Sequence, residues 1–212
     1  MSYRESVMSV STSATHRTSN RLFISAKTLS PIRFTAPAVH TALVQVTLDP
    51  AVRSLDFVPT VEVSDTAVAV DLAVISCSDG RYRLDVSDGH KMRDIDGEGL
   101  FLLALEQLGL PPLTLTREDL DREPYSSNCS LVWANRRVRV HASDRIRSLQ
   151  LLTEEGSATL SQVAAEMRLS SDPVAAVLAL ACQDLVEIDL KSSPLGPESV
   201  LRRRTPEGDS HG

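Results

Sequence analysis

The sequence predicts a mixed α/β protein whose β-sheet is flanked by helices and followed by a small helical unit. Three observations predict this class. A β-branched apolar segment and an alternating segment flank a turn at residues 78–80, an apolar helical pattern covers residues 97–109, and three short helical patterns follow Ser143. A chain of 212 residues is long enough for one large domain or one domain with a small addition. We expect a first domain at residues 21–140 and a second at residues 141–204.

Both ends of the chain are expected to be disordered. Residues 1–20 are rich in Ser and Thr without an apolar period, and residues 205–212 are polar with Gly and Pro. The N-terminus lacks the apolar core of a secretion signal, and no segment approaches the roughly 18 apolar residues of a membrane span. The three cysteines lie far apart, which predicts neither a disulfide framework nor a zinc site. We expect a soluble, cytoplasmic protein with no membrane partner.

Charge is distributed unevenly along the chain. The net charge of -6 argues against a nucleic-acid coat protein or a polybasic membrane binder. The acids concentrate at residues 49–124, where sixteen acidic residues oppose seven basic ones, while residues 1–48 and 125–168 are net basic. Only three basic residues are lysines, so chemistry that needs a lysine has few candidates: Lys27, Lys91 and Lys191.

A β-hairpin is predicted from the strands at residues 67–76 and 81–86, with a Ser-Asp-Gly turn between them. Asp71 interrupts the apolar first strand, and Asp85 lies near the end of the second. If the loop has three residues, Asp71 lies directly opposite Asp85 on the same face. A shift of the register by one residue places the two carboxylates on different faces.

The remaining elements of the first domain follow from local signals. The apolar pattern at residues 97–109 is apolar almost all round and stops at a Gly before two prolines, which predicts a buried helix. Residues 113–116 predict a short strand, and residues 117–123 a turn or short helix. Residues 128–137 predict a helix that ends in arginines.

The C-terminal pattern is helix, helix, helix and strand. The first helix covers residues 143–155, the second opens with a capping box at Thr159, and the third opens with Asp172 before a proline. The strand covers residues 185–190. This succession within about 50 residues is the outline of a winged helix-turn-helix, and it predicts a small winged-helix-like C-terminal domain.

The two strand aspartates are the sharpest candidates for chemistry. Two carboxylates on one sheet face offer the hard oxygen ligands that Mg²⁺ or Mn²⁺ prefers, and metal-dependent nucleases hold such an ion against a phosphodiester. The alternative is that Asp71 is a half-buried strand acid paired with Arg81 or Arg83. In the first interpretation Asp71 and Asp85 are both metal ligands and catalytic residues.

The serial order of several segments carries a resemblance that covers roughly residues 20–204. The segments are DPAVRSLDFVP (49–59), AVDLAVISCSDGRYRLDVSDG (69–89), the helix at 97–109, LTLTREDL (113–120), NCSLVWANRR (128–137) and the closing helices. In this order they resemble the TnsA-like endonuclease subunits of heteromeric transposases, of the restriction-endonuclease-like PD-(D/E)xK superfamily. The resemblance implies a mixed sheet flanked by helices, Mg²⁺ or Mn²⁺ at strand acids, and cleavage of DNA at a transposon end. It also implies a DDE-type transposase and an AAA-type ATPase as partners.

The resemblance implies a degenerate catalytic motif when it is carried over residue by residue. Asp71 matches the first strand acid, and Asp85 falls at the position of the second. Ser87 falls where the family has a lysine, and a neutral hydroxyl supplies no fixed charge for a phosphate. The family's helical acid is also missing, because residues 34–48 contain no Asp or Glu.

Three residues are considered as replacements for the missing groups. Lys91 lies six residues after Asp85, and Lys27 lies in the N-terminal segment; either lysine could turn inward. His40 could replace the helical acid as a ligand of metal or water. The alternatives are an ordinary solvated lysine in each case and a histidine packed in the core.

An arginine cluster is the best candidate for contact with phosphates. Arginine side chains match phosphate oxygens bidentately, and each neutralised phosphate releases counterions. The alternative is a solvated face between the domains. The third C-terminal helix offers mostly alanine at the positions expected to face outward, which favours packing or protein docking over contact with base edges. The cluster comprises Arg136, Arg137, Arg139, Arg145 and Arg147.

Three hypotheses of function follow. The first is a TnsA-like transposition protein with a nuclease fold and a degenerate motif, which acts in DNA binding or in assembly with a transposase. The second is an active metal-dependent DNA endonuclease that uses Asp71 and Asp85 with a relocated Lys91 or His40. The third is a non-enzymatic winged-helix DNA-binding regulator or adaptor.

Overall fold

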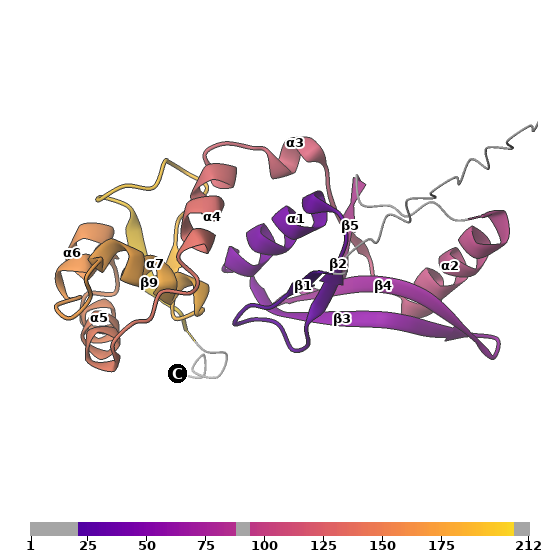
Figure 1. Ribbon diagram of the computed structural model, residues 1–212, viewed down its shortest axis with the longest axis horizontal. Coiled ribbons are helices and arrows are strands. Elements are labelled where there is room, and N and C mark those ends of the chain that lie inside the picture. Colours follow the sequence, from indigo (N-terminus) through magenta and orange to yellow (C-terminus); the bar gives the residue numbers. More distant parts are fainter. Residues whose placement is uncertain (1–20, 88–93, 206–212) are drawn as a thin grey trace, which may run out of the picture.

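The computed structural model describes residues 21–87 and 94–205. Figure 1 shows an elongated molecule, with a long β-hairpin and one helix at one end and a group of helices at the other. The arm expected at residues 1–20 and the tail beyond residue 205 lie outside the described residues, as does Lys91. Within the described ranges, the helices are all too short or too polar to cross a membrane.

A four-stranded mixed sheet forms the centre of the N-terminal part, which we define as residues 21–120. Its order is β3-β4-β5-β6; the first three strands are antiparallel, and β6 runs parallel to β5. The predicted mixed sheet flanked by helices is confirmed. The elements are β1 (Arg21–Phe23), β2 (Ile32–Phe34), α1 (Pro37–Leu48), β3 (Val52–Val63), β4 (Thr66–Cys77), β5 (Gly80–Val86), α2 (Ile95–Leu108), β6 (Pro112–Leu115) and α3 (Arg117–Leu120).

Helix α2 forms as predicted, but the prediction that it is buried is wrong. Asp94 caps its first turn by accepting a hydrogen bond from the backbone N–H of Gly97, and Gly109 ends it in a left-handed conformation with a φ of 61°. Only Phe101 and Ala104 are buried, whereas Leu102 is 56% exposed. The helix packs with one face on the far half of the β3–β4 hairpin (Figure 1).

The C-terminal part, residues 142–204, contains three helices and a three-stranded antiparallel sheet of order β7-β9-β8. The predicted capping box is present, with the Thr159 side chain and Gln162 exchanging hydrogen bonds, and Asp172 caps the third helix. The sequence did not predict β9, which completes the sheet. The elements are α5 (Ala142–Glu155), β7 (Ala158–Thr159), α6 (Leu160–Ala165), α7 (Pro173–Cys182), β8 (Val186–Ile188) and β9 (Val200–Arg203).

Helix α4 (Tyr125–Ala134) stands between the two parts and packs against both α1 and α7. It begins before the predicted helix and ends at Ala134, so the arginines that follow lie in a turn rather than on the helix. Helix α7 is buried. Its predicted outward positions were wrong, because they lie against neighbouring elements: Ala175 is 8% exposed, and Ala176 and Ala179 are fully buried. Small side chains let the helices approach closely, which agrees with a packing role for α7.

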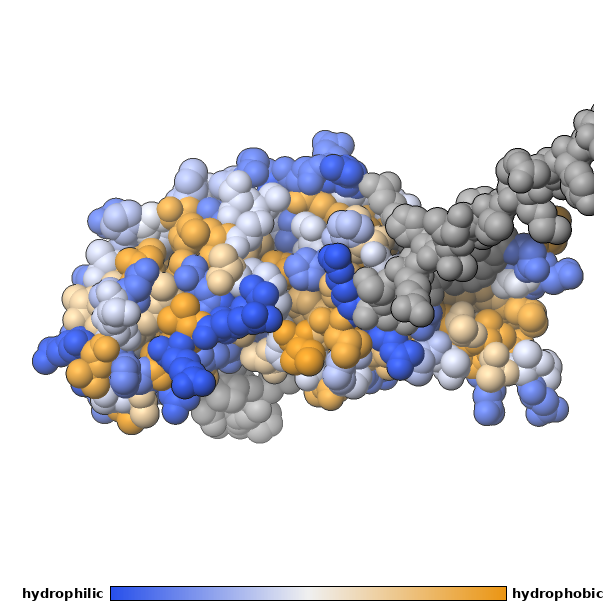
Figure 2. Space-filling view, in the orientation of Figure 1, coloured by the Kyte–Doolittle hydropathy of each residue, from blue (hydrophilic) through white to orange (hydrophobic). Residues whose placement is uncertain are grey.

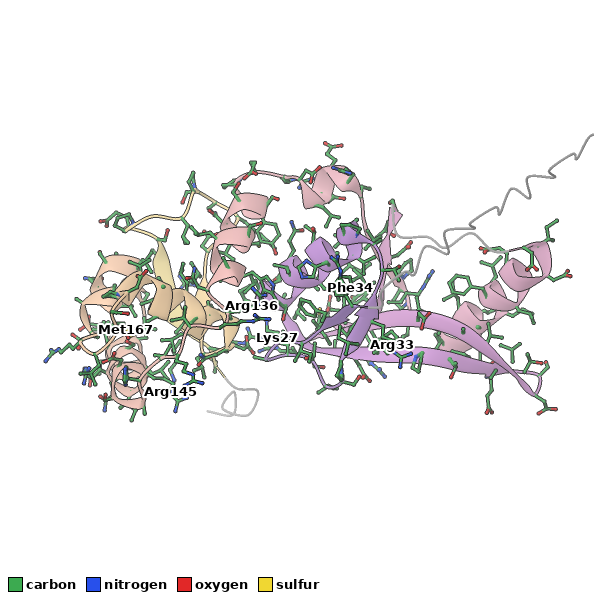
Figure 3. All side chains as sticks on the ribbon, viewed as in Figure 1. Lys27, Arg33, Phe34, Arg136, Arg145 and Met167 are labelled. Atoms are coloured by element: carbon green, nitrogen blue, oxygen red, sulfur yellow. The ribbon has the colours of Figure 1, made fainter. Side chains whose placement is uncertain are left out.

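Ion pairs and hydrogen bonds join the two parts where α1 ends. The Lys27 side chain is 3% exposed; its Nζ donates to the Asp49 carbonyl at 2.8 Å and lies 3.3 Å from Asp184 Oδ1. Arg204 lies 3.5 Å from Asp184 and 2.7 Å from Glu187, and it also donates to the carbonyls of Pro50 and Val52. Burial lowers the pKa of Lys27, which the Asp184 carboxylate partly opposes. In Figure 3 Lys27 lies between the two parts.

Candidate functional site

Asp71 and Asp85 line the same cavity, of about 300 Å³. The cavity opens where β4 and β5 diverge. The paired stretch of the two strands begins with Cys77 opposite Gly80 and ends with Val74 opposite Arg83. Both aspartates lie beyond that stretch. Residues of α2 cover part of it, and Arg33 of β2 and Arg83 of β5 contribute to its lining. The topology therefore brings the two predicted acids together at a fork in the sheet.

Of the two hairpin registers that the sequence leaves open, the structure has the one in which Asp71 and Asp85 are not directly opposite each other. Cys77 pairs with Gly80, so the loop has two residues instead of three, and the register is shifted by one. Continued along the strands, that register places Leu72 across from Asp85. Two-residue loops are favoured in hairpins because their twist matches that of the strands.

A β-bulge determines the position of Asp71. The pairing of β3 with β4 shifts between Val58 and Thr60, so that Val70 and Asp71 together face Pro59. Proline has no N–H to donate to the ladder, which makes it a suitable residue opposite a bulge. Asp71 has a φ of 47°, a left-handed conformation that costs an ordinary residue on the order of 1 kcal/mol or more. Bulges reorient side chains and occur often next to active sites, which makes Asp71 a candidate functional residue.

The cavity carries charges of both signs. Glu98 of α2 lines it together with the two aspartates, and Arg33 and Arg83 are its basic residues. Thr114 of β6 donates a hydrogen bond to Asp85 Oδ2 at 3.4 Å. Neither Arg33 nor Glu98 carries a local sequence signal, because both reach the cavity from elements outside the β4–β5 hairpin. Arginine holds its proton at neutral pH, so these arginines can neutralise a phosphate but cannot act as a base.

The fit of a divalent metal to this cavity is partial. Mg²⁺ commonly takes one or two protein carboxylates and completes its shell with water and phosphate oxygens, and Asp71 and Asp85 are the residues that would hold it. Within residues 21–87 and 94–205, no group of three or more His, Cys, Asp or Glu side chains is placed to hold a metal ion.

The proposed replacement groups that the structure describes lie elsewhere. His40 of α1 packs against the rings of Phe23 and Phe34, with centroids at 5.9 and 5.1 Å, and faces a different cavity. Lys27 is buried between the two parts of the chain. Ser87, at the lysine position, is exposed just beyond β5. Neither His40 nor Lys27 belongs to the lining of the aspartate cavity.

The predicted arginine cluster divides into two kinds of residue. Arg136 donates to the Trp133 carbonyl at 3.0 Å, and its guanidinium lies 5.1 Å from the centre of the Trp133 ring. Arg136, Arg137, Arg139 and Arg145 are exposed. Arg147 is a weaker candidate for phosphate contact, because it pairs with the buried Asp144 and approaches Glu166 at 3.9 Å.

Arginines are distributed along the length of the molecule. Figure 3 places Arg145 in the C-terminal part, Arg136 at the centre and Arg33 near the sheet. Figure 2 shows strongly hydrophilic side chains on the same view, over both parts of the chain, with apolar side chains between them.

Comparison of the sequence with models of known protein families and with curated proteins found no match.

Proposed function

We propose that this protein is a TnsA-like transposition protein with a restriction-endonuclease-like domain, a degenerate catalytic motif and a winged-helix-like C-terminal domain. It acts in DNA binding or in assembly with a DDE-type transposase and an AAA-type ATPase. The observation that carries the proposal is the aspartate cavity, where a bulge holds Asp71 in a left-handed conformation beside the Asp85 strand. Backbone strain of this kind persists only where the surrounding structure imposes it.

Two missing groups support the degenerate motif. Helix α1 lies where the resembling family has its helical acid, and its sequence, PAVHTALVQVTL, contains no carboxylate. Ser87 occupies the lysine position and is exposed beyond the end of β5. Among residues 21–87 and 94–205, the lining of the cavity includes these two acids and no lysine that could orient an attacking water and stabilise charge on the phosphate. Lys91 lies outside those residues.

Arg33 and Arg83 favour a second candidate function, that of an active nuclease. They bring fixed positive charge to the cavity that holds Asp71 and Asp85. A guanidinium can stabilise negative charge that develops on a phosphate, which is one of the two roles of the missing lysine.

We expect no cutting of supercoiled DNA by the purified protein with Mn²⁺ or Mg²⁺, because the motif lacks two groups. The measurement is the conversion of supercoiled plasmid to nicked or linear forms. Asp65→Asn is the matched control for Asp71→Asn, since Asp65 lies in the same hairpin and also has a left-handed backbone, with a φ of 65°. Cutting that survives Asp65→Asn and disappears in Asp71→Asn and Asp85→Asn would establish the active nuclease instead.

DNA binding is expected to depend on the exposed arginines near α5. Each phosphate contact contributes roughly 0.9 to the slope of log affinity against log salt, so replacing Arg139 and Arg145 by Gln should weaken DNA binding and reduce that slope by about two. Arg168→Gln is the control, because Arg168 is 68% exposed in the same part of the chain but pairs with Glu166. The measurement is fluorescence anisotropy of labelled duplex DNA over a series of salt concentrations. An unchanged slope in the double variant would remove these two residues from the DNA surface.

The buried state of α7 limits how the C-terminal domain could act as a regulator. In a helix-turn-helix the second helix, which corresponds to α7 here, reads DNA from the major groove. Here α7 packs against α1, α4, α6 and β8, and six of its residues are buried. A winged-helix regulator or adaptor would therefore use another surface, and the exposed arginines before and within α5 are the ones we propose.

A further inference from the structure

A second cavity, of about 620 Å³, lies where β1, α1, α4 and the end of α7 meet. We call it the junction groove. Leu22 and Ile24 line it with 58% and 63% of their surface exposed. In Figure 3 Arg136 marks this region at the centre of the molecule. The residues used in the argument are Leu22, Ile24, His40, Trp133, Arg136 and Arg137.

The junction groove is cationic. Among the described residues that line it are two arginines and no carboxylate, whereas the aspartate cavity has three carboxylates in its lining. The positive charge also affects His40 of the lining. Burial lowers the pKa of His40, and the charges of Arg136 and Arg21 lower it further. The other groups at His40 are the uncharged rings of Phe23 and Phe34. A bound anion would therefore meet only positive or neutral side chains in the described lining.

Trp133 lines the junction groove. Its side chain is 8% exposed and stacks on Phe23, with ring centroids 5.1 Å apart and an interplanar angle of 14°. The Arg136 guanidinium lies 5.1 Å from the centre of the same ring. The indole Nε1 is itself buried, so Trp133 contributes to the groove by holding Arg136 in place and not by donating to a ligand.

We propose that the junction groove binds the phosphate of a nucleotide, with Arg136 and Arg137 on the phosphate oxygens and Leu22 and Ile24 against the nucleoside. The nucleotide is either free or a unit of a DNA strand. Phosphate binding in the groove does not depend on the proposed function. Only the assignment of the nucleotide to a DNA strand rests on that function. Arg136 is preorganised for this contact, because its stacking on Trp133 and its hydrogen bond to the Trp133 carbonyl fix the guanidinium before binding.

The chain offers a built-in probe, since Trp133 is its only tryptophan. We expect saturable changes in Trp133 fluorescence on titration with inorganic phosphate, deoxyadenosine monophosphate and a short single-stranded oligonucleotide, with excitation at the red edge of indole absorption. Arg136→Gln and Arg137→Gln should each weaken binding roughly tenfold, the loss expected for one charge-assisted contact. Arg168→Gln should leave binding unchanged. Arg137→Gln is the decisive variant, because Arg136 also packs on the reporting ring.

The binding measurements distinguish a free nucleotide from a DNA strand as the ligand, and they test phosphate binding in the groove separately from the proposed function. Tighter binding of the oligonucleotide than of the mononucleotide assigns the groove to a DNA strand, and equal or tighter binding of the mononucleotide assigns it to a free nucleotide. Failure of all three probes to give a saturable change, or wild-type affinity in Arg137→Gln, overturns the inference. If the Arg139 and Arg145 double variant loses DNA affinity while Trp133 responds to no probe, the inference fails and the proposed DNA binding stands.

Discussion

Arg204→Ala is expected to lower the free energy of unfolding by about 3–5 kcal/mol, the range for removal of one partner from a buried ion pair. The Arg204 side chain is only 9% exposed. It lies 2.7 Å from Glu187 and 3.5 Å from Asp184, and donates to the backbone carbonyls of Pro50 and Val52. Its removal leaves two carboxylates and two carbonyls short of a donor at the contact between the two parts of the chain.

The neighbouring arginine provides the matched control. Arg202 lies two residues earlier on β9 and is exposed, so Arg202→Ala should change the free energy of unfolding by no more than about 0.5 kcal/mol. Urea unfolding followed by Trp133 fluorescence measures both variants, because Trp133 belongs to α4, which packs against both parts. Equal destabilisation by the two substitutions would show that the Arg204 contacts contribute nothing of their own.

Asp144→Ala is expected to destabilise the protein by about 3 kcal/mol or more, because it removes the acceptor of a buried network. Asp144 is fully buried. It accepts hydrogen bonds from Arg147, from the backbone N–H of Leu169 at 3.1 Å and from the Ser170 hydroxyl at 2.9 Å. These contacts fasten the start of α5 to the loop between α6 and α7. Without the carboxylate, Arg147 loses its closest partner and the loop loses two acceptor contacts.

Glu154→Ala is the control for this substitution. Glu154 lies on the same helix, carries the same charge and is exposed, so its removal should cost no more than about 0.5 kcal/mol. The measurement is the midpoint of unfolding in urea, together with far-UV circular dichroism to detect loss of the C-terminal helices. A small effect of Asp144→Ala, within the range of Glu154→Ala, would contradict the structural role assigned to the network.

The different surroundings of the arginines explain why charge alone is a poor guide to function in this chain. Nineteen of the 22 basic residues are arginines, and their roles differ although their sequence environments look alike. Arg204 is buried in an ion network, Arg202 is exposed two residues away, and Arg147 pairs with Asp144. Only Arg136, Arg137, Arg139 and Arg145 in the predicted cluster remain available to a phosphate.

Local signals predicted most of the elements. The β-branched apolar segment at residues 67–76 and the alternation at residues 81–86 predicted the hairpin, and the capping residues Thr159 and Asp172 marked the starts of α6 and α7. These signals are readable because a cap or an alternating strand depends on residues only a few positions apart. The sequence also selected Asp71 and Asp85, which the fold brings to one cavity.

The register of the β4–β5 hairpin and the burial of α2 could not be predicted from such local signals. The two-residue loop set the hairpin register that the sequence left open, and the bulge opposite Pro59 gave Asp71 its left-handed backbone. Helix α2 has a sequence that fits a buried helix, yet Leu102 is exposed because only one face of the helix meets the hairpin.

The sequence by itself determined where the β4–β5 hairpin and the helices α2, α5, α6 and α7 form, and which acids interrupt the strands of that hairpin. Tertiary structure decided that Arg204 and Lys27 join the two parts, that α7 is buried, and that Trp133, Arg136 and Arg137 meet at one groove. The reason is physical. Helix caps and strand alternation are short-range, whereas ion pairs, burial and cavities depend on groups that folding brings together from distant parts of the chain.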